Sequence, residues 1–328
     1  MAHEPKSLQE AIQYFADPDR CIDYLANRRW KDGVVLCPTC GSKEVAYVPS
    51  RRVWQCKTRH PKCQFSIKVG TIFEDSPIGL DKWLTAMWMC ANCRNGVSSW
   101  EIHRTLKVTQ KSAWFMLQRI RLALQDKQSG GKLGGENGGA VEVDETFIGG
   151  KARNMHREKR RRLSDHVATQ GGGGKAIVLG MLERDGRVRA EVISNRKKQT
   201  VEPVLRSHVN AGSVLMTDEF NVYRSMGSDY VHKMVNHLEK YVDGNVHTNG
   251  IENFWSLLKR SLGGTYVSVE PFHLFRYVDE QAFRFNNRKD EFGNKLNDGE
   301  RFDIAVSQIV GKRLTYSELT GKDSATPF

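Results

Sequence analysis

The stretch Val141-Glu142-Val143-Asp144-Glu145-Thr146 alternates apolar and acidic side chains with the period of a β-strand. Val141 and Val143 face one way, while Glu142 and Asp144 face the other. A second apolar stretch, Val214-Leu215-Met216-Thr217-Asp218-Glu219, has a similar form. We interpret both as strands that end on a carboxylate, Asp144 in the first and Asp218 in the second.

A third stretch, His247-Thr248-Asn249-Gly250-Ile251-Glu252, opens an amphipathic helix that runs from Ile251 to about Leu262. Two strand-end aspartates and this helix glutamate can converge as a ring of hard oxygen ligands. Such a ring repels itself unless cations occupy it, so divalent metal is its natural occupant. Two metal ions held in this way suit in-line displacement at phosphorus.

Each of these acids also has a structural explanation. Aspartate often forms the turn at the end of a strand, and Glu142, Glu145 and Glu219 are competing neighbours. Asn249 followed three residues later by Glu252 is a capping box, in which the glutamate would only accept a backbone N–H. The alternatives therefore stay open on the residues alone.

The chain has 328 residues, enough for about two domains, and its formal net charge is +12. This excess of Lys and Arg predicts a polyanionic partner, with nucleic acid as the first candidate. An acidic membrane surface is the second, but no lipidation signal or basic amphipathic anchor supports it.

Residues 1–10 are polar and lack the apolar segment of a signal peptide, and no apolar run is long enough to span a bilayer. The seven cysteines are an odd number, which favours free thiols in a reducing compartment over a disulfide framework. We therefore expect a cytoplasmic protein without a membrane partner.

Cys37 and Cys40, followed by a glycine, have the spacing of a zinc-ribbon knuckle, which directs two thiolates at one tetrahedral ion. Cys56 and Cys63 form the second pair, but six residues separate them. His60 lies between them and is a possible substitute ligand. We expect a structural Zn²⁺ at this site, and the alternative is a metal-free remnant with buried thiols.

Residues 81–125 have helical periodicity, and the turn at 107–109 separates two short helices that resemble a helix-turn-helix. The alternative is an ordinary helical hairpin with solvated charges. In the DNA-binding interpretation, the start of the second helix lies near base edges and two arginines lie near phosphates. The residues concerned are Gln110, Lys111 and Ser112 for the bases, and Arg119 and Arg121 for the phosphates.

The Gly-rich stretch 129–140 predicts a flexible linker and the main domain boundary. A basic segment at 151–162, which includes Arg160, Arg161 and Arg162, is either a solvated face or a phosphate contact. Beyond it, strands at 176–182 and 188–193 form a hairpin, and helices and strands then alternate. This order predicts an α/β fold with a mixed sheet and helices packed on it.

Together these patterns predict six consecutive segments. They are a helical segment at 1–30, a zinc ribbon at 31–75, a helix-turn-helix region at 76–128, a linker at 129–140, a catalytic domain at 141–290 and a C-terminal tail at 291–328.

The blocks at 143–151, 217–223 and 247–260 resemble the ISXO-type transposases of bacterial insertion sequences. They read Val-Asp-Glu-Thr-Phe-Ile-Gly-Gly-Lys, Thr-Asp-Glu-Phe-Asn-Val-Tyr and His-Thr-Asn-Gly-Ile-Glu-Asn-Phe-Trp-Ser-Leu-Leu-Lys-Arg. The segments 64–83 and 108–121 resemble the same group. The match covers roughly residues 20 to 288, and the order of its motifs is specific.

The resemblance implies a ribonuclease-H-like catalytic domain of the DDE type behind a zinc ribbon and a helix-turn-helix. It implies a bacterial, nucleoid-associated enzyme that cuts and joins DNA at element ends with two Mg²⁺ or Mn²⁺ ions. Asp144, Asp218 and Glu252 match the metal ligands, and Lys259 matches a basic residue two helical turns beyond the third acid. The family's third acidic position varies between Glu and Asn, so Asn249 is a competing ligand.

Two other functions fit the same residues. A DNA-binding regulator would keep the fold without cutting, although all three acids are present in this chain. A nuclease of this fold would hydrolyse DNA without joining it. Because a transposase pairs two element ends, we also expect a homo-oligomer when the chain is bound to DNA.

Overall fold

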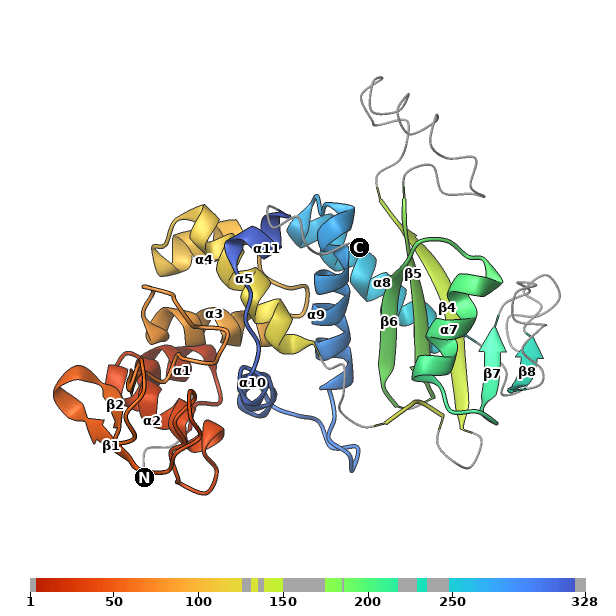
Figure 1. Ribbon diagram of the computed structural model, residues 1–328. Helices are drawn as coiled ribbons and strands as arrows, with labels where there is room; N and C mark the ends of the chain where they lie inside the picture. The colour runs from red at the N-terminus through yellow and green to blue at the C-terminus, as the bar shows by residue number, and fades with distance from the viewer. Residues whose placement is uncertain are drawn as a thin grey trace. The chain divides into compact units, whose positions relative to one another are not determined.

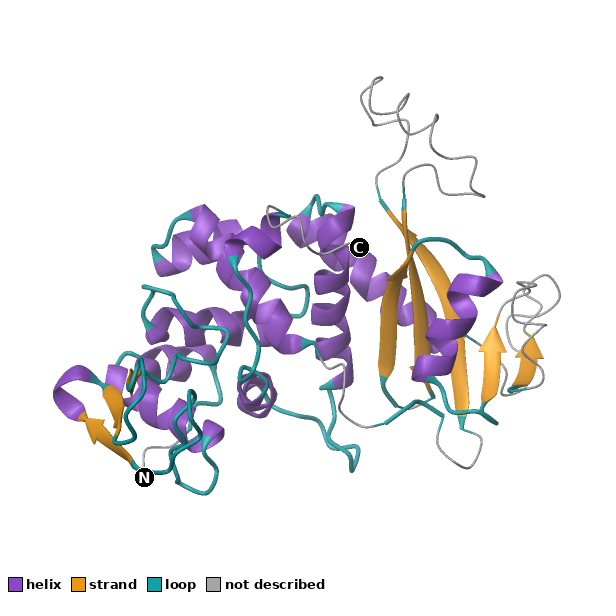
Figure 2. Cartoon of the chain, in the orientation of Figure 1, coloured by secondary structure: helices purple, strands orange, loops and turns teal. Residues whose placement is uncertain are grey.

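The computed structural model describes residues 4–125, 131–134, 139–149, 175–184, 186–217, 229–234 and 248–321 (Figures 1 and 2). The chain divides into two compact units. A helical unit comprises residues 1–125 and 287–328, and a sheet unit comprises residues 126–286.

The helical unit begins with α1 (Leu8–Phe15) and α2 (Pro18–Arg29). A small antiparallel sheet follows, formed by β1 (Val45–Val48), β2 (Val53–Cys56) and β3 (Gln64–Phe65), with the 3-10 turn η1 (Pro49–Arg51) between its first two strands. The remaining helices of this unit are α3 (Leu80–Asn92), α4 (Ser99–Leu106), α5 (Gln110–Leu124), α10 (Asp298–Ser307) and α11 (Tyr316–Thr320). Its largest fully buried side chains include Trp83, Trp88, Phe15, Phe73 and Phe302.

The segment after Asn287 belongs to this helical unit, although the sequence pattern left residues 291–328 as a tail. The Ile72 N–H donates to the carbonyl of Ile309, and the Gly311 N–H donates to the carbonyl of Gly70. Lys312 Nζ then donates to the carbonyl oxygens of Ala123 and Gln125 at the end of α5, at 2.8 Å each. The C-terminal segment therefore lies along α5 and covers part of it.

The sheet unit contains five strands in the order β6-β5-β4-β7-β8. β4 (Ala140–Ile148), β5 (Ala176–Glu183) and β6 (Val188–Ile193) are antiparallel neighbours, while β7 (Val214–Thr217) and β8 (Val231–Met234) run parallel to β4. The helices of this unit are α7 (Lys198–His208), α8 (Asn249–Ser261) and α9 (Leu274–Asn286), with short turns η4 (Leu262–Tyr266) and η5 (Pro271–His273) between the last two.

Both faces of the large sheet are covered by helices (Figures 1 and 2). On one face, Val141 and Val143 pack with Val201 and Leu205 of α7. On the other face, α8 and α9 bury a second cluster against β5 and β6. The predicted alternation of β4 is thus confirmed: Val141 and Val143 enter one core, and Glu142 and Asp144 face α8.

Two local predictions need correction. Asp144 does not end its strand, because β4 pairs with β5 at eight consecutive positions and continues to Ile148. Within the Gly-rich stretch, Leu133 is buried in the core beneath α7, and its N–H donates to the carbonyl of His208 at 2.7 Å. This residue belongs to the sheet unit rather than to a flexible linker, because its side chain and its backbone both have partners there.

Candidate active site and zinc cluster

Asp144 lies in the middle of β4, on the face that carries α8. Its Oδ2 accepts a hydrogen bond from the indole Nε1–H of Trp255, at 2.9 Å. Trp255 is in the second turn of α8 and is buried. One side of the Asp144 carboxylate is therefore held by a helix that begins more than a hundred residues later in the chain.

Glu142, two residues earlier on the same face, caps the start of α8. Its Oε2 accepts the backbone N–H of Ile251 at 2.9 Å, and Arg184 lies 3.7 Å from its other oxygen. Glu142 is only 2% exposed, so this carboxylate is not directed at solvent. An N-terminal N–H of a helix is unsatisfied within the helix and attracts negative charge, so this contact stabilises α8 on β4.

Glu252 is exposed, and its Oε1 accepts a hydrogen bond from the hydroxyl of Thr248 at 3.3 Å. The helix begins with Thr248 as its N-cap residue and without a side-chain cap there, while Asn249 is already helical and exposed. The capping-box explanation of Glu252 required Asn249 as the N-cap. Glu142 takes the capping role instead, which leaves the Glu252 carboxylate available for another function.

The remaining predicted acid, Asp218, lies outside the described residues, as do Arg160, Arg161 and Arg162. The strand before Asp218 is described: Thr217 is fully buried, and its hydroxyl is 2.7 Å from Nε2 of His232 on β8. Lys259 lies two turns after Glu252 on α8 and is exposed.

The zinc cluster in the helical unit is formed by Cys37, Cys40, Cys56 and His60, whose ligand atoms all lie within 4.8 Å of one another. Cys40 Sγ is 3.7 Å from Cys56 Sγ, and Cys37 Sγ is 3.4 Å from His60 Nε2. Tetrahedral zinc with bonds of about 2.3 Å to sulfur and 2.0 Å to nitrogen separates such atoms by roughly 3.8 and 3.5 Å. The four residues therefore fit one zinc ion.

The fourth ligand differs from the sequence prediction, which placed Cys63 in the set and His60 as its substitute. The Cys63 thiol is not in the cluster, and the Cys63 carbonyl accepts the N–H of Cys56 at 2.8 Å. His60 Nδ1 is 2.7 Å from the carbonyl of Pro61, which fixes Nδ1 as the protonated nitrogen and presents Nε2 to the cluster.

The thiol and the imidazole of this cluster ionise in opposite senses toward cation binding. Burial opposes ionisation of the Cys37 thiol, but hydrogen bonds from the backbone at Cys40 and Thr39 and from neighbouring thiols lower its pKa to about 6. The hydrogen bond to the Pro61 carbonyl, followed by that to Cys56, raises the pKa of His60 to about 9. A readily formed Cys37 thiolate favours a cation, whereas His60 would have to release its proton before Nε2 could bind zinc.

The helices α4 and α5 form the predicted pair around a turn. Ser98 caps α4 in a capping box with Glu101, and the Thr109 side chain caps α5 by accepting the N–H of Ser112 at 3.1 Å. Gln110 Nε2 donates to the hydroxyl of Ser99 at 3.0 Å. Lys111 is exposed, with Nζ 4.6 Å from the centre of the Tyr316 ring.

Arg119 and Arg121 are both buried, so the prediction that they contact phosphates is corrected. Arg119 is 5% exposed and Arg121 is 1% exposed. Arg119 Nε donates to the carbonyl of Leu314 and Nη1 donates to that of Glu74. The C-terminal segment supplies one of these acceptors, and sequence periodicity within α5 gave no sign of it.

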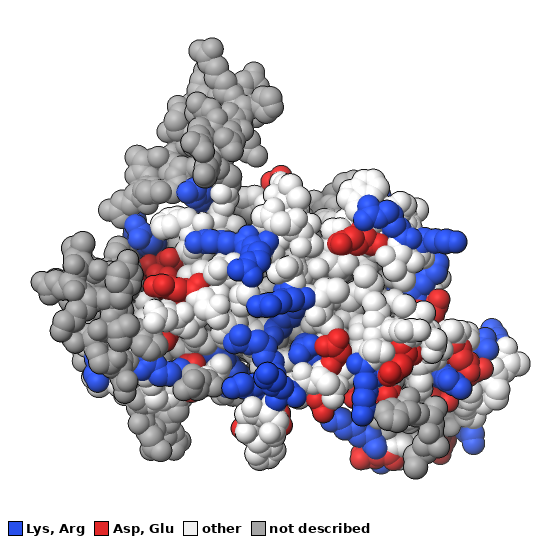
Figure 3. All heavy atoms as spheres, turned by 180° about the vertical axis from the view of Figure 1, so that it is seen from behind, with Lys and Arg blue, Asp and Glu red and all other residues white. Residues whose placement is uncertain are grey.

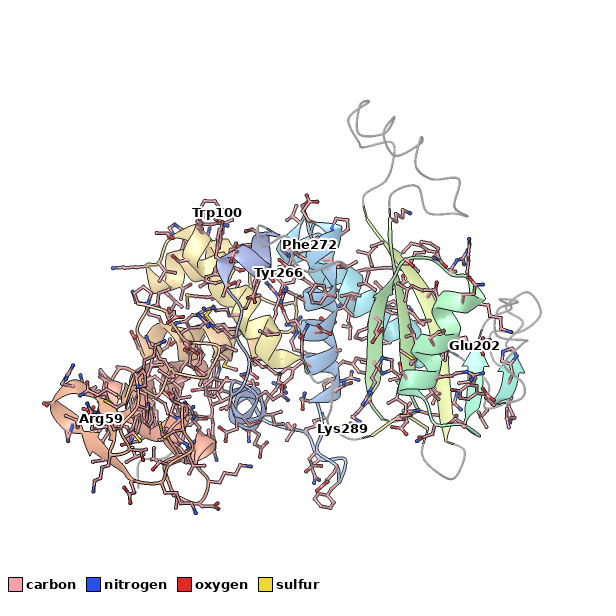
Figure 4. All side chains as sticks on the ribbon, in the orientation of Figure 1. Arg59, Trp100, Glu202, Tyr266, Phe272 and Lys289 are labelled. Carbon is pink, nitrogen blue, oxygen red and sulfur yellow. The ribbon has the colours of Figure 1, made fainter. Side chains whose placement is uncertain are left out.

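On the face drawn in Figure 3, Lys and Arg side chains are spread over the visible surface, with Asp and Glu in smaller groups. On α4, Trp100 is 58% exposed and projects from the helix (Figure 4).

Among the described residues, no helix has both the length and the apolar character needed to cross a membrane.

Sequence reasoning treated Trp255 only as an apolar residue and Glu142 only as a competitor of Asp144. One signal pointed to Trp255: an isolated glycine, Gly180, interrupts the apolar strand β5. Such a glycine often marks the close approach of another group. Here that group is the indole ring, because a Cβ on Gly180 would lie 2.5 Å from Cζ2 of Trp255.

The two regions of the chain that contain these sites both match known protein families. Residues 136–286 match the family model of the ISXO2-like transposase domain, and residues 17–66 match that of the transposase zinc-ribbon domain. The chain is 28% identical over 264 residues to an uncharacterized protein in transposable element ISH50 of Halobacterium salinarum, covering 76% of this chain and 85% of that protein. It is 31% identical over 102 residues to an uncharacterized transposase-like protein of Haemophilus influenzae, covering 31% of this chain and 82% of that protein.

The matched ranges coincide with the two structural features described above. The first lies within the sheet unit that carries Asp144 and Glu252, and the second contains Cys37, Cys40, Cys56 and His60. The chain therefore belongs to the family of ISXO2-like insertion-sequence transposases.

Proposed function

We propose that the protein is a DDE-type DNA transposase that cleaves one strand at the terminal inverted repeats of its insertion sequence and joins the freed 3′ end to target DNA. Asp144, Asp218 and Glu252 hold two Mg²⁺ or Mn²⁺ ions, and Lys259 contacts the DNA phosphates beside them. The observation that carries this proposal is the hydrogen bond from Trp255 to Asp144, which joins the strand of the first acid to the helix that carries Glu252.

Trp255 connects these two acids. Its indole donates to Asp144, and Glu252 precedes it by three residues, so the two helical side chains are neighbours on the surface of α8. Trp255 thus contacts the strand carboxylate and follows the helix carboxylate by about one turn. This arrangement supports a shared metal site.

The strand register supports Asp218 as the third member. β4 and β7 are parallel neighbours, with Ala140 opposite Val214 and Glu142 opposite Met216, an offset of 74 positions (214 − 140). Asp144 and Asp218 are separated in the sequence by the same 74 positions (218 − 144). The same sheet, with three antiparallel strands and two parallel to the first, supports a ribonuclease-H-like fold.

The donor set fits hard divalent ions, because Mg²⁺ and Mn²⁺ prefer carboxylate oxygens. When bound, such ions polarise the scissile phosphate and stabilise the charge that develops on the attacking and leaving oxygens. In cleavage, the oxygen of water bonds to phosphorus and the bond to the 3′ oxygen breaks. The resulting 3′-hydroxyl then attacks a phosphate of target DNA: a bond forms between its oxygen and phosphorus while the bond from that phosphorus to the target's own 3′ oxygen breaks. No covalent bond between protein and DNA is needed.

We assign recognition of the element ends to α4 and the first turn of α5, with Gln110, Lys111 and Ser112 facing the bases. The N-terminal turn of the second helix is the part that reaches base edges in a helix-turn-helix, and here it carries the exposed Lys111. The basic segment containing Arg160, Arg161 and Arg162 is assigned to phosphate contacts. Two copies of the chain pair the two element ends.

The test of the proposed function uses labelled DNA that carries an element end and target DNA, with Mg²⁺ or with EDTA. Nicked and joined products are expected with Mg²⁺ only. Nicks without joined products would identify a nuclease, and specific binding without either product would identify a regulator. Either result would overturn the transposase assignment.

Replacing Lys111 by Ala is expected to weaken binding to the element end by about 1–3 kcal/mol, because a base contact is lost. Binding to unrelated DNA of the same length should change less. Lys6→Ala removes the same charge from an exposed position before α1 and serves as the control in a fluorescence-anisotropy titration. Equal weakening on both DNAs would place Lys111 at the phosphates instead.

A further inference from the structure

The indole ring of Trp255 is held in a notch of the sheet beside Asp144. Gly180 on β5 is the residue paired with Asp144, and its missing side chain creates the notch. A Cβ at this position would lie 2.5 Å from Cζ2 and 2.6 Å from Cη2 of Trp255, closer than real Cβ atoms approach. The ring is 4% exposed, and its Nε1–H points at Asp144 Oδ2.

A second notch holds the start of the same helix. Gly250 precedes Ile251, whose N–H donates to Glu142, and a Cβ on Gly250 would lie 2.5 Å from Leu182 and 2.8 Å from the Glu142 carboxylate. Glu142 is paired with Leu182 just as Asp144 is paired with Gly180. Glu142 and Asp144 therefore each contact α8 at a point where a glycine allows a close approach.

The two contacts match in spacing. Glu142 and Asp144 are two strand residues apart, which corresponds to about 6.7 Å. Their partners, Ile251 and Trp255, are four helical residues apart, which corresponds to about 6 Å. The helix can thus satisfy both acids at once only in this register, and Glu252 lies between the two contacts.

We infer that Trp255 is a positioning residue for the metal site: its indole N–H orients the Asp144 carboxylate, and the Glu142–Gly250 contact sets the register that brings Glu252 beside it. This inference rests on the proposed function, because it assigns Asp144 and Glu252 to metal. A carboxylate has about four lone-pair positions, so accepting one N–H leaves capacity for an ion. Donors that orient metal ligands in this way typically change metal affinity or activity by 10–100-fold when removed.

The test is Trp255→Phe, which keeps an aromatic side chain on α8, removes the N–H donor and gives up the distal ring atoms that fill the Gly180 notch. Binding of Mn²⁺ is measured directly by electron paramagnetic resonance without DNA, and nicking is measured against Mg²⁺ concentration. We expect the dissociation constant for Mn²⁺ and the half-saturating Mg²⁺ concentration both to rise by about 10–100-fold. Unchanged values for both would overturn the inference.

The matched control is Trp83→Phe in the helical unit. It also removes one indole hydrogen bond, from Nε1 to the hydroxyl of Ser76 at 3.0 Å, and it also replaces a buried tryptophan. A general loss of stability would affect both variants alike, whereas a positioning role predicts weakened metal binding for Trp255→Phe alone. An equal change in metal binding for the two variants would overturn the inference.

A measurement on the protein with all its tryptophans intact covers the case in which Trp255→Phe does not fold. The chain has seven tryptophans, so its nitrogen-15 spectrum contains seven indole signals. One of them is expected to shift on Asp144→Asn and to broaden on addition of Mn²⁺. The absence of any signal that responds to both would overturn the inference.

If metal binds as expected but no DNA is cut, the proposed function fails and the positioning role stands.

Discussion

Replacing Asp144 by Asn is expected to reduce nicking and joining by at least about 10³-fold while binding to the element end stays within about twofold. Metal ions contribute several kcal/mol to charge stabilisation in phosphoryl displacement, and about 4 kcal/mol corresponds to 10³ in rate. Asparagine has nearly the shape of aspartate and keeps an oxygen that can accept the Trp255 N–H. The substitution therefore removes the negative charge while keeping the contact that joins β4 to α8.

The control for this variant is Glu145→Gln, which removes a carboxylate from the next residue of β4. Because successive strand residues face opposite sides, Glu145 does not share the α8 face of Asp144. We expect its rates to match those of the unmodified protein, and Asp218→Asn to behave like Asp144→Asn. Folding is compared by thermal denaturation without metal. Full activity of Asp144→Asn, or loss of activity in Glu145→Gln, would overturn the choice of ligand.

The features of the sheet unit that depend on local patterns were predictable from the sequence. The alternation around Asp144 gave the two faces of β4, and the apolar periodicity after Gly250 gave α8 to within about two residues. The hairpin of β5 and β6 followed from its turn residues. These signals work because each element must bury one face whatever its neighbours are.

The contacts that connect elements were not predictable in this way. The bonds from Ile251 to Glu142 and from Trp255 to Asp144 join residues separated by 109 and 111 positions, so only the packed fold reveals them. The burial of Arg119 also depends on a contact between distant residues, because the carbonyl that accepts its hydrogen bond belongs to Leu314, 195 residues away. Helical period alone describes such an arginine as solvated, since charged side chains are usually exposed.

The spacing of the cysteines predicts only part of the zinc ligand set. Spacing identifies Cys37 and Cys40, because a short loop and a glycine determine the direction of both thiols. It does not separate His60 from Cys63, because the choice depends on the path of the chain after Cys56. Lys62 has a left-handed backbone with φ of 62°, an uncommon conformation for a residue with a side chain. The ligand set therefore follows from the turn geometry rather than from the count between cysteines.

Replacing His60 by Ala is expected to abolish the binding of one zinc equivalent per chain and to unfold the ribbon. Zinc contributes about 10–16 kcal/mol of apparent binding free energy to small domains of this kind. The aromatic core beneath the cluster is small, with Trp54 packed against Trp30 and Phe65 at ring separations of 5.2 and 6.0 Å. Metal analysis gives the zinc content, and resistance to proteolysis across residues 31–66 reports folding.

Cys63→Ser provides the matched control, because it removes the nearby thiol that does not belong to the cluster. Its backbone carbonyl still accepts the Cys56 N–H, so the strand contact beside the site is kept. This variant should retain one zinc equivalent and the protease resistance of the unmodified chain, whereas Cys37→Ser should behave like His60→Ala. Zinc lost from Cys63→Ser and retained in His60→Ala would reverse the assignment and restore the four-cysteine set. If the unmodified protein, purified without chelator, contains no zinc, the zinc assignment fails. The ribbon would then be stabilised by its aromatic core alone.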